Sequence, residues 1–160
     1  MGKVLTNFMK FFPGAISRSV DDIVISMKNA TSSPIAAGAA VFVSSDGSGV
    51  TTVRPGSTPD EFVGIAVRSP SATPETYGAD VRPYAANDPV DILVRGCITV
   101  ALENAATTAG GEVHLNLSDG TYATEEEEDV TIQLPNCSWR RSAAATDNCA
   151  EIVIRERNLI

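Results

Sequence analysis

The side chains with the most chemical potential in this 160-residue sequence are one histidine and three cysteines. A catalytic histidine works beside a nucleophile or a carboxylate, and no signature of a serine or cysteine nucleophile surrounds His114. Zinc needs clustered ligands at short spacing, whereas Cys97, Cys137 and Cys149 are scattered and form no C-x-x-C pair. We therefore expect no catalytic residue, no cofactor and no metal site, and we expect His114 to be a structural or a surface residue.

The cysteines also indicate the redox compartment in which the protein folds. Cys97 lies inside an apolar run and is expected to act as a small buried hydrophobic side chain. An odd cysteine count without a recognisable framework favours free thiols in a reducing compartment. A bridge between Cys137 and Cys149 remains the alternative.

The acidic run from Glu125 to Asp129 is the one stretch with ligand-like chemistry. Five adjacent carboxylates repel one another, and a calcium ion would relieve that repulsion. The run lacks the alternating acidic residues and the glycine of a calcium loop, however. We expect a solvated loop, with cation binding as the alternative.

Net charge limits the kinds of partner. The chain carries −8 at pH 7, which argues against nucleic acid and against an anionic membrane surface. Four basic and two acidic side chains lie in residues 1–28, so the remaining 132 residues carry −10. Crowded copies of such a body repel one another, so contacts between copies must be apolar or charge-paired. Arginines suit this role because their planar guanidinium groups bind carboxylates bidentately. The candidates are Arg68, Arg95, Arg140 and Arg141.

The elements that would position these side chains are short strands. The composition favours Ala, Val, Thr, Ser, Gly and Pro, and turn residues separate short apolar or alternating runs. This pattern predicts an all-β fold, either a small antiparallel barrel or a jelly-roll-like sandwich. Gly96 marks a bend or bulge in the longest run. The expected strands are residues 22–27, 39–43, 62–67, 81–84, 90–102, 113–117, 130–134 and 151–157.

The N-terminus differs from the rest of the chain. Apolar residues recur there at helical spacing from Gly2 to Phe12, and Pro13-Gly14 ends the pattern. A three-turn helix is marginal alone in water, so it must pack against something. We expect an amphipathic arm over residues 1–20 and one β-rich domain over residues 21–160. The apolar stripe of the arm consists of Val4, Leu5, Phe8, Met9 and Phe12.

Several motifs follow one another along most of the chain. They are E-F-V-G-I-A-V-R (61–68), Y-A-A-N-D-P-V (84–90), D-I-L-V-R-G (91–96), the glycine turn Gly110-Gly111 with the strand after it, the Trp139 region with its Ser/Ala-rich continuation, and A-E-I-V-I (150–154). In this order they resemble the motifs of bacteriophage capsid structural cement (decoration) proteins. The chain departs from the family pattern at Asn87, where a glycine is usual, and at the N-terminal helix, which is not a family feature. Asn tolerates positive φ, so the turn at Asn87 is expected to persist.

This resemblance implies a non-enzymatic virion protein that binds the outer surface of a capsid. It would bridge neighbouring major capsid proteins and stabilise the shell, acting as a homo-oligomer. A trimer is preferred and a dimer is possible. The alternative is another virion β-module, such as a tail, head-fibre or receptor-binding piece. The arm and the four arginines are the candidate contacts, with the arm seated on capsid protein, on a neighbouring subunit or on its own domain.

Overall fold

The computed structural model describes residues 13–68 and 83–158, and nine strands account for most of its regular structure. All pairs between these strands are antiparallel, so the all-β antiparallel class predicted from the sequence is confirmed. The expected helix and its apolar stripe lie outside the described residues. The strands are β1 (Ile16–Lys28), β2 (Ala40–Val43), β3 (Val50–Thr52), β4 (Phe62–Ala66), β5 (Pro89–Ala101), β6 (Glu112–Asn116), β7 (Tyr122–Ala123), β8 (Thr131–Trp139) and β9 (Cys149–Ile154), with 3-10 turns at Pro59–Glu61 and Ala145–Asp147.

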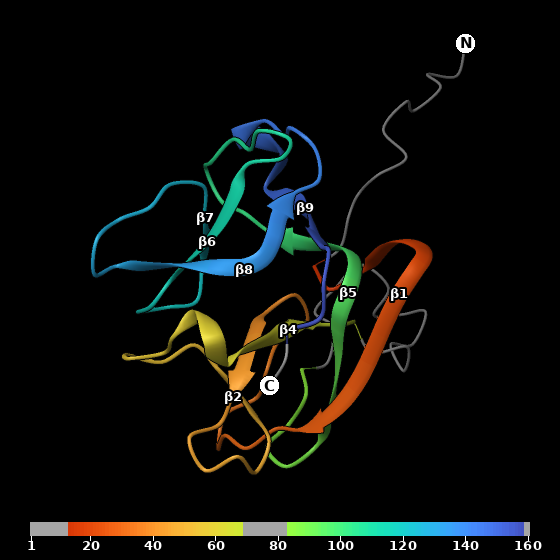
Figure 1. The fold of residues 1–160 in the computed structure, drawn as a ribbon, viewed down its shortest axis with the longest axis vertical. Helices are drawn as coiled ribbons and strands as arrows, with labels where there is room; N and C mark the ends of the chain where they lie inside the picture. Colours follow the sequence, from red (N-terminus) through yellow and green to blue (C-terminus); the bar gives the residue numbers. More distant parts are fainter. Residues whose placement is uncertain (1–12, 69–82, 159–160) are drawn as a thin grey trace.

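All nine strands belong to one sheet, in the order β3-β2-β4-β5-β9-β8-β6-β7, with β1 paired to β5 (Figure 1). Strand β5 joins the two halves of this sheet. Its first part pairs with β4 at Ile92 and Leu93, and its second part pairs with β9 from Gly96 onward. Strand β1 lies along the opposite edge of β5 over almost its whole length.

Gly96 is the point at which β5 changes partner. Its φ of +126° favours glycine, and a β-carbon there would collide with the carboxylate of Asp22. The pairing between β1 and β5 is irregular at this place, with register shifts on both sides of Ile23. The bend or bulge predicted at Gly96 is therefore confirmed, and it separates the two halves of the sheet.

The two halves enclose the larger of two hydrophobic cores. Phe42 and Phe62 from the first half pack in it with Leu134 and Trp139 from the second. The two phenylalanine rings meet edge to face at 5.7 Å. The Tyr122 hydroxyl also donates a hydrogen bond to the Gly38 carbonyl across the halves, at 2.8 Å. The single sheet thus folds over on itself and buries this core between its two halves.

The smaller core lies on the other face of β4 and of the first part of β5. Leu93 points into the larger core, while its neighbours Ile92 and Val94 point into the smaller one. Ile25 and Met27 of β1 pack against this second core. Both faces of β5 are therefore buried, which explains the nearly continuous apolar run in its sequence.

Several elements extend further than the sequence pattern indicated. Strand β1 begins at Ile16, so residues 16–20, assigned to the arm from the sequence, are paired within the sheet. Gly14 anchors the chain just before this strand, because its N–H donates to the Thr99 carbonyl at 2.8 Å and its carbonyl accepts from the Arg68 N–H at 2.8 Å. Of the expected strand at 81–84, Tyr84 is described and forms an isolated bridge with Ile35.

Candidate functional site

His114 is a buried residue of β6. Its neighbours Val113 and Leu115 enter the larger core, and the His114 side chain is 4% exposed on the opposite face. Nε2 lies 3.6 Å from Glu112 Oε2, and Nδ1 has no hydrogen-bond partner among the described residues. A histidine so placed is closed to a substrate-sized molecule. Its burial supports the structural alternative, and the expected alternative of a surface position is wrong.

None of the three cysteines forms a disulfide. Cys97 and Cys137 are buried, as expected for Cys97, and burial raises the pKa of the Cys137 thiol far above its usual range. Cys137 pairs with Ile154 at one end of β9, whereas Cys149 lies at the other end of that strand. A strand of this length separates the two sulfur atoms, so the alternative of a Cys137–Cys149 bridge is wrong.

The acidic run from Glu125 to Asp129 is exposed in the loop between β7 and β8. The loop is held by its backbone, because the Glu127 N–H donates to Thr131 Oγ1 at 2.9 Å. Within residues 13–68 and 83–158, no group of three or more His, Cys, Asp or Glu side chains converges in a way that could hold a metal ion.

Arg141, one of the four candidate arginines, forms an ion pair inside the chain. Its Nε lies 2.9 Å from Glu151 Oε2, and the Ser17 hydroxyl donates to the other carboxylate oxygen at 2.6 Å. The Glu151 side chain is 1% exposed. This network joins the start of β1, strand β9 and the segment after β8. Nothing in the sequence marked Glu151, the first residue of the expected strand at 151–157, as buried.

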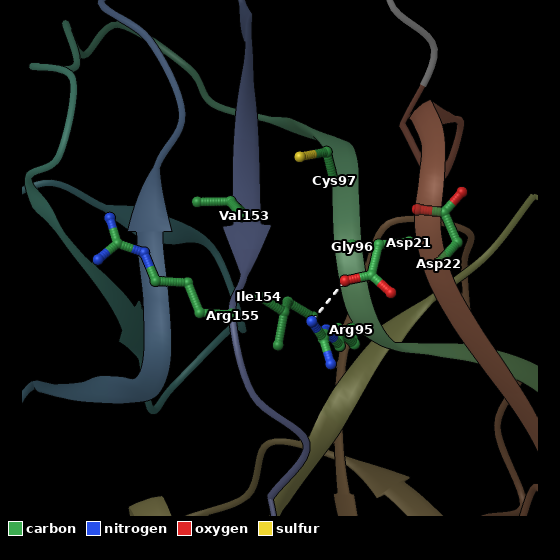
Figure 2. Close-up of a pocket in the computed structure, with 8 residues that line it drawn as sticks. All are labelled: Asp21, Asp22, Arg95, Gly96, Cys97, Val153, Ile154 and Arg155. Carbon is green, nitrogen blue, oxygen red and sulfur yellow. Dashed lines mark ion pairs between the residues drawn. The ribbon is translucent and has the colours of Figure 1, made fainter.

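Arg95 also pairs within the chain, with Asp21 of β1 (Figure 2). The pair lies at an open pocket where β1 and β9 flank the bend of β5. Figure 2 shows the guanidinium of Arg155 turned away from this pair, and Arg155 Nη2 lies 3.2 Å from Ser138 Oγ. We call this hollow the Gly96 pocket. Its lining residues are Asp21, Asp22, Arg95, Gly96, Cys97, Val153, Ile154 and Arg155.

Asp22 is the under-satisfied group of the Gly96 pocket. Oδ1 has no hydrogen-bond partner among the described residues, although the carboxylate accepts a bond from the Cys97 N–H. Desolvation raises the pKa of Asp22 above its usual value, and the neighbouring Asp21 carboxylate adds to the increase. No motif marked these two aspartates in the sequence. An acidic pair inside an otherwise alternating strand is the only signal that could have found them.

The remaining candidate arginines lie apart from this pocket. Arg68 follows β4 and is half-buried beside Gly14. Arg140 follows β8 with an exposed side chain, and its backbone N–H donates to the Glu151 carbonyl at 2.7 Å. Two of the four candidate arginines, Arg95 and Arg141, are thus engaged by acidic residues of the same chain. The five apolar residues of the arm are not described, so the structure leaves the candidate contact set as a prediction.

The most apolar exposed positions of the described chain lie on β1. Ile23 is 39% exposed and Val24 is 42% exposed, and Val130 beside the acidic loop is the third such residue. Ile23 and Val24 adjoin the Gly96 pocket through Asp22. A strand edge with exposed apolar side chains and an under-satisfied carboxylate is suited to protein contact rather than to chemistry.

Two of three comparisons with known proteins find a match. The family model described as structural cement protein (E217 gp24/Pam3 gp6) matches residues 3–155. A chain in the solved capsid of Myoviridae phage XM1 shares the fold, with a TM-score of 0.75 and 17% identity over 97% of this chain and 96% of that chain. A search of curated proteins finds no match. Among the described residues, no helix is long and apolar enough to cross a membrane.

Proposed function

The chain belongs to the phage structural cement protein family, and from this premise we propose that it binds the outer surface of an assembled capsid and bridges neighbouring major capsid proteins. It is a structural component of the virion that stabilises the capsid. The observation that carries this conclusion is the family match over residues 3–155, nearly the whole chain.

The physical properties of the molecule suit this role. A cement protein must resist deformation, and the described domain has two cores and a central strand buried on both faces. It must also stay soluble before assembly, which its net charge of −8 favours. One copy that contacts several capsid subunits at once binds multivalently. The high effective concentration of the remaining contacts then makes attachment long-lived even if each contact is weak.

The proposal includes a role without catalysis. His114 is buried in a strand, and the Gly96 pocket contains neither this histidine nor any serine. The carboxylates of that pocket are Asp21, which is paired with Arg95, and Asp22, which lies against the bend of β5. The thiol of the pocket, Cys97, is buried and has no histidine beside it among the lining residues, so the pocket offers no activated nucleophile for hydrolytic chemistry.

The contacts with the shell are assigned to the arm and to exposed arginines. Burying Phe8 and Phe12 against a partner would contribute about 1.5–3 kcal/mol each. Gly14, which follows these residues, is fixed to the domain by backbone hydrogen bonds with Thr99 and Arg68. Homo-oligomers on the shell are part of the proposal, as trimers or dimers on local symmetry axes.

Decoration of empty capsids tests the proposal. Purified protein is added to expanded capsids that lack it, and bound copies are counted by cosedimentation and cryo-electron microscopy. Saturable, symmetric density on the outer surface is the expected result. Failure to bind capsids, together with binding to host cells or their glycans, would instead favour a tail, head-fibre or receptor-binding module.

A further inference from the structure

The strand order of the sheet reads the same from either end. From one edge the neighbours are β3, β2, β4 and β5, and from the other they are β7, β6, β8 and β9. Each set consists, in chain order, of a hairpin and two further strands, and the sets meet where β5 pairs with β9. In Figure 1, β2 and β4 lie in the lower part of the molecule and β6 to β9 in the upper part, with β5 between them. This order indicates an internal repeat.

The pairing registers of the two sets also match. In each set, a row of cross-strand partners runs from the first strand of the hairpin to the last strand. The row begins at Ala40 in the first set and at Glu112 in the second, and each is the first residue of its strand. The rows are Ala40, Ile65 and Leu93 in the first set, and Glu112, Ser138 and Val153 in the second.

Backbone hydrogen bonds recur at equivalent positions. The Gly38 N–H donates to the Ala66 carbonyl at 2.8 Å in the first set. The Gly110 N–H donates to the Trp139 carbonyl at 2.8 Å in the second, and the two glycines have φ of +85° and +80°. The two sets therefore share a backbone conformation. Two further bonds have equal lengths in both sets, 2.9 Å from Ala66 to Ala39 and from Trp139 to Gly111, and 2.7 Å from Val67 to Asp91 and from Arg140 to Glu151.

Strand β1 gives the first set a fifth strand. It lies beside the first part of β5, with Ile25 opposite Ile92. The second part of β5 lies beside β9 in the same way, with Ile98 opposite Ile152. Strand β1 is thus equivalent to the second part of β5. A hydrogen bond follows each pairing, from the Asn29 N–H to the Asp88 carbonyl at 2.9 Å and from the Leu102 N–H to the Asn148 carbonyl at 3.2 Å.

We propose that the domain is a tandem duplication of one five-strand repeat. The first repeat extends from Ile23 to Arg95, and the second extends from Gly96 to Ile154. Strand β5 then combines the last strand of the first repeat with the first strand of the second. Its bend at Gly96 is the boundary between the repeats. One chain is thereby built as a fused pair, an inference that goes beyond the proposed function.

The two repeats bury the same face of their strands. In the first repeat this face forms the smaller core, and in the second it belongs to the larger core. Separate cores explain why each repeat can keep its own set of strands. The equivalent pairs include Val41 and Val113, Ile92 and Ile152, and Ile25 and Ile98.

The opposite faces of the two repeats differ in polarity. In the first repeat this face is apolar, and Phe42, Ile65 and Leu93 pack in the larger core with the second repeat. Among the described residues, no further repeat covers the equivalent face of the second one. The terminal unit of a repeat protein needs a polar outer face. The equivalent positions of the second repeat hold His114, Ser138 and Val153.

The duplication accounts for the single histidine. His114 is the equivalent of Phe42, so the position keeps an aromatic ring while the ring becomes polar. Its Nε2 lies 3.6 Å from Oε2 of Glu112, which is the equivalent of buried Ala40. A capping role for this pair needs no catalysis.

An insertion at the boundary tests the duplication on the full chain. In the pairing of β1 with β5, residues 19–22 have no opposite residue, so the ladder is already interrupted beside Gly96. A short Gly/Ser segment between Arg95 and Gly96 should therefore lengthen a connection between two complete repeats. The melting temperature should fall by less than about 8 °C.

Matched insertions inside each repeat provide the control. The same segment between Ile92 and Leu93, or between Ile98 and Thr99, separates buried neighbours within one strand and disrupts its register. Both control proteins should lose the cooperative thermal transition. If the boundary insertion is as destructive as the controls, or if all three insertions are tolerated equally, a repeat boundary at Gly96 is refuted.

Residual dipolar couplings of the wild-type protein provide a test that requires no variant. They report the orientation of each backbone N–H bond. One rotation should carry the N–H bonds of the first repeat onto their equivalents in the second. If the hairpins and the last strands required different rotations, the duplication would be wrong.

Discussion

Arg141 Nε lies 2.9 Å from Glu151 Oε2, and the two side chains differ greatly in exposure, at 44% for the arginine and 1% for the glutamate. A carboxyl group this deeply buried needs hydrogen-bond donors or positive charge beside it to offset the loss of its hydration. Arg141 therefore acts within the fold, where it supports the junction of β1 and β9. The adjacent Arg140 is exposed and is better placed to contact a neighbouring molecule.

The two adjacent arginines should separate stability from binding. Arg141→Ala removes a charge-assisted hydrogen bond from buried Glu151 and is expected to lower the free energy of unfolding by about 1.5–3 kcal/mol. Arg140→Ala should leave that free energy within about 0.5 kcal/mol of wild type. Urea unfolding of both variants measures the difference. If both variants had the same free energy of unfolding, the ion pair between Arg141 and buried Glu151 would not contribute to stability.

The bend of β5 should depend on glycine at position 96. Gly96→Ala combines a positive φ of +126° with a collision against Asp22, and should cost about 1–3 kcal/mol or more. Gly47→Ala is the matched control, because Gly47 has a φ of +68° with nothing near its β-carbon position. The Gly47→Ala variant should show the cost of backbone strain alone, and so a smaller decrease in stability than Gly96→Ala. Thermal unfolding compares the two, and a larger loss for G47A would contradict the bend mechanism.

Asp22 should make the domain less stable as its carboxyl ionises. Its pKa is raised in the folded protein, first by desolvation and then by Asp21, while the Cys97 N–H opposes the increase. The folded state then binds more protons than the unfolded state just above the ordinary pKa of 3.8, so stability falls as pH rises through this window. Arg95 is engaged by Asp21, and Arg155 turns away. Asp22→Asn should therefore raise the melting temperature of dilute protein at pH 7, with no gain below pH 3.8.

Asp46 provides the control of opposite sign. Hydrogen bonds from the Ser44 hydroxyl and from Ser48 lower its pKa to about 2. Its contribution is therefore present above pH 3.8 and is lost as pH falls toward 2. Asp46→Asn should lower the melting temperature at pH 7, with the difference disappearing in acid. The same sign of effect for both asparagine variants would contradict these assignments.

The arm should matter for attachment more than for folding. Deletion of residues 1–12 leaves Gly14 and its two backbone hydrogen bonds in place, so the domain should unfold at nearly the wild-type temperature. Capsid occupancy should fall strongly if the arm seats Phe8 and Phe12 on a partner. A large drop in melting temperature would instead show that the arm packs on its own domain. Unchanged occupancy would remove the arm from the contact set.

The sequence indicated those strands whose patterns are strongly apolar. Strand β5 and the bend at Gly96 were predictable because a β-branched run with one internal glycine has few other solutions. The start of β1 was missed, because the residues after Ile16 are polar and pair with β5 only through tertiary context. Strand β8 was predicted to end at Leu134, before Pro135. It continues because Asn136 takes a φ of +58° and re-aims the chain.

The candidate site was less predictable than the fold. The arginines were proposed as contact residues from the chemistry of their side chains alone. That chemistry does not reveal that Arg95 is paired with Asp21, or Arg141 with Glu151, inside the chain. Burial of Glu151 depends on neighbours distant in sequence, including Ser17, which lies 134 residues away. Solvent exposure and free strand edges follow from the order of strands in the sheet. An alternating pattern at residues 22–27 gives no information about that order.

Calorimetry of whole capsids tests the central claim most directly. Expanded capsids are heated with and without saturating protein, and the temperature of shell disruption is recorded alongside occupancy. A protein that bridges neighbouring capsid subunits should raise this temperature in proportion to the bound copies, because it binds the intact shell and not its separated subunits. Full occupancy with no rise in the disruption temperature would contradict the cement function.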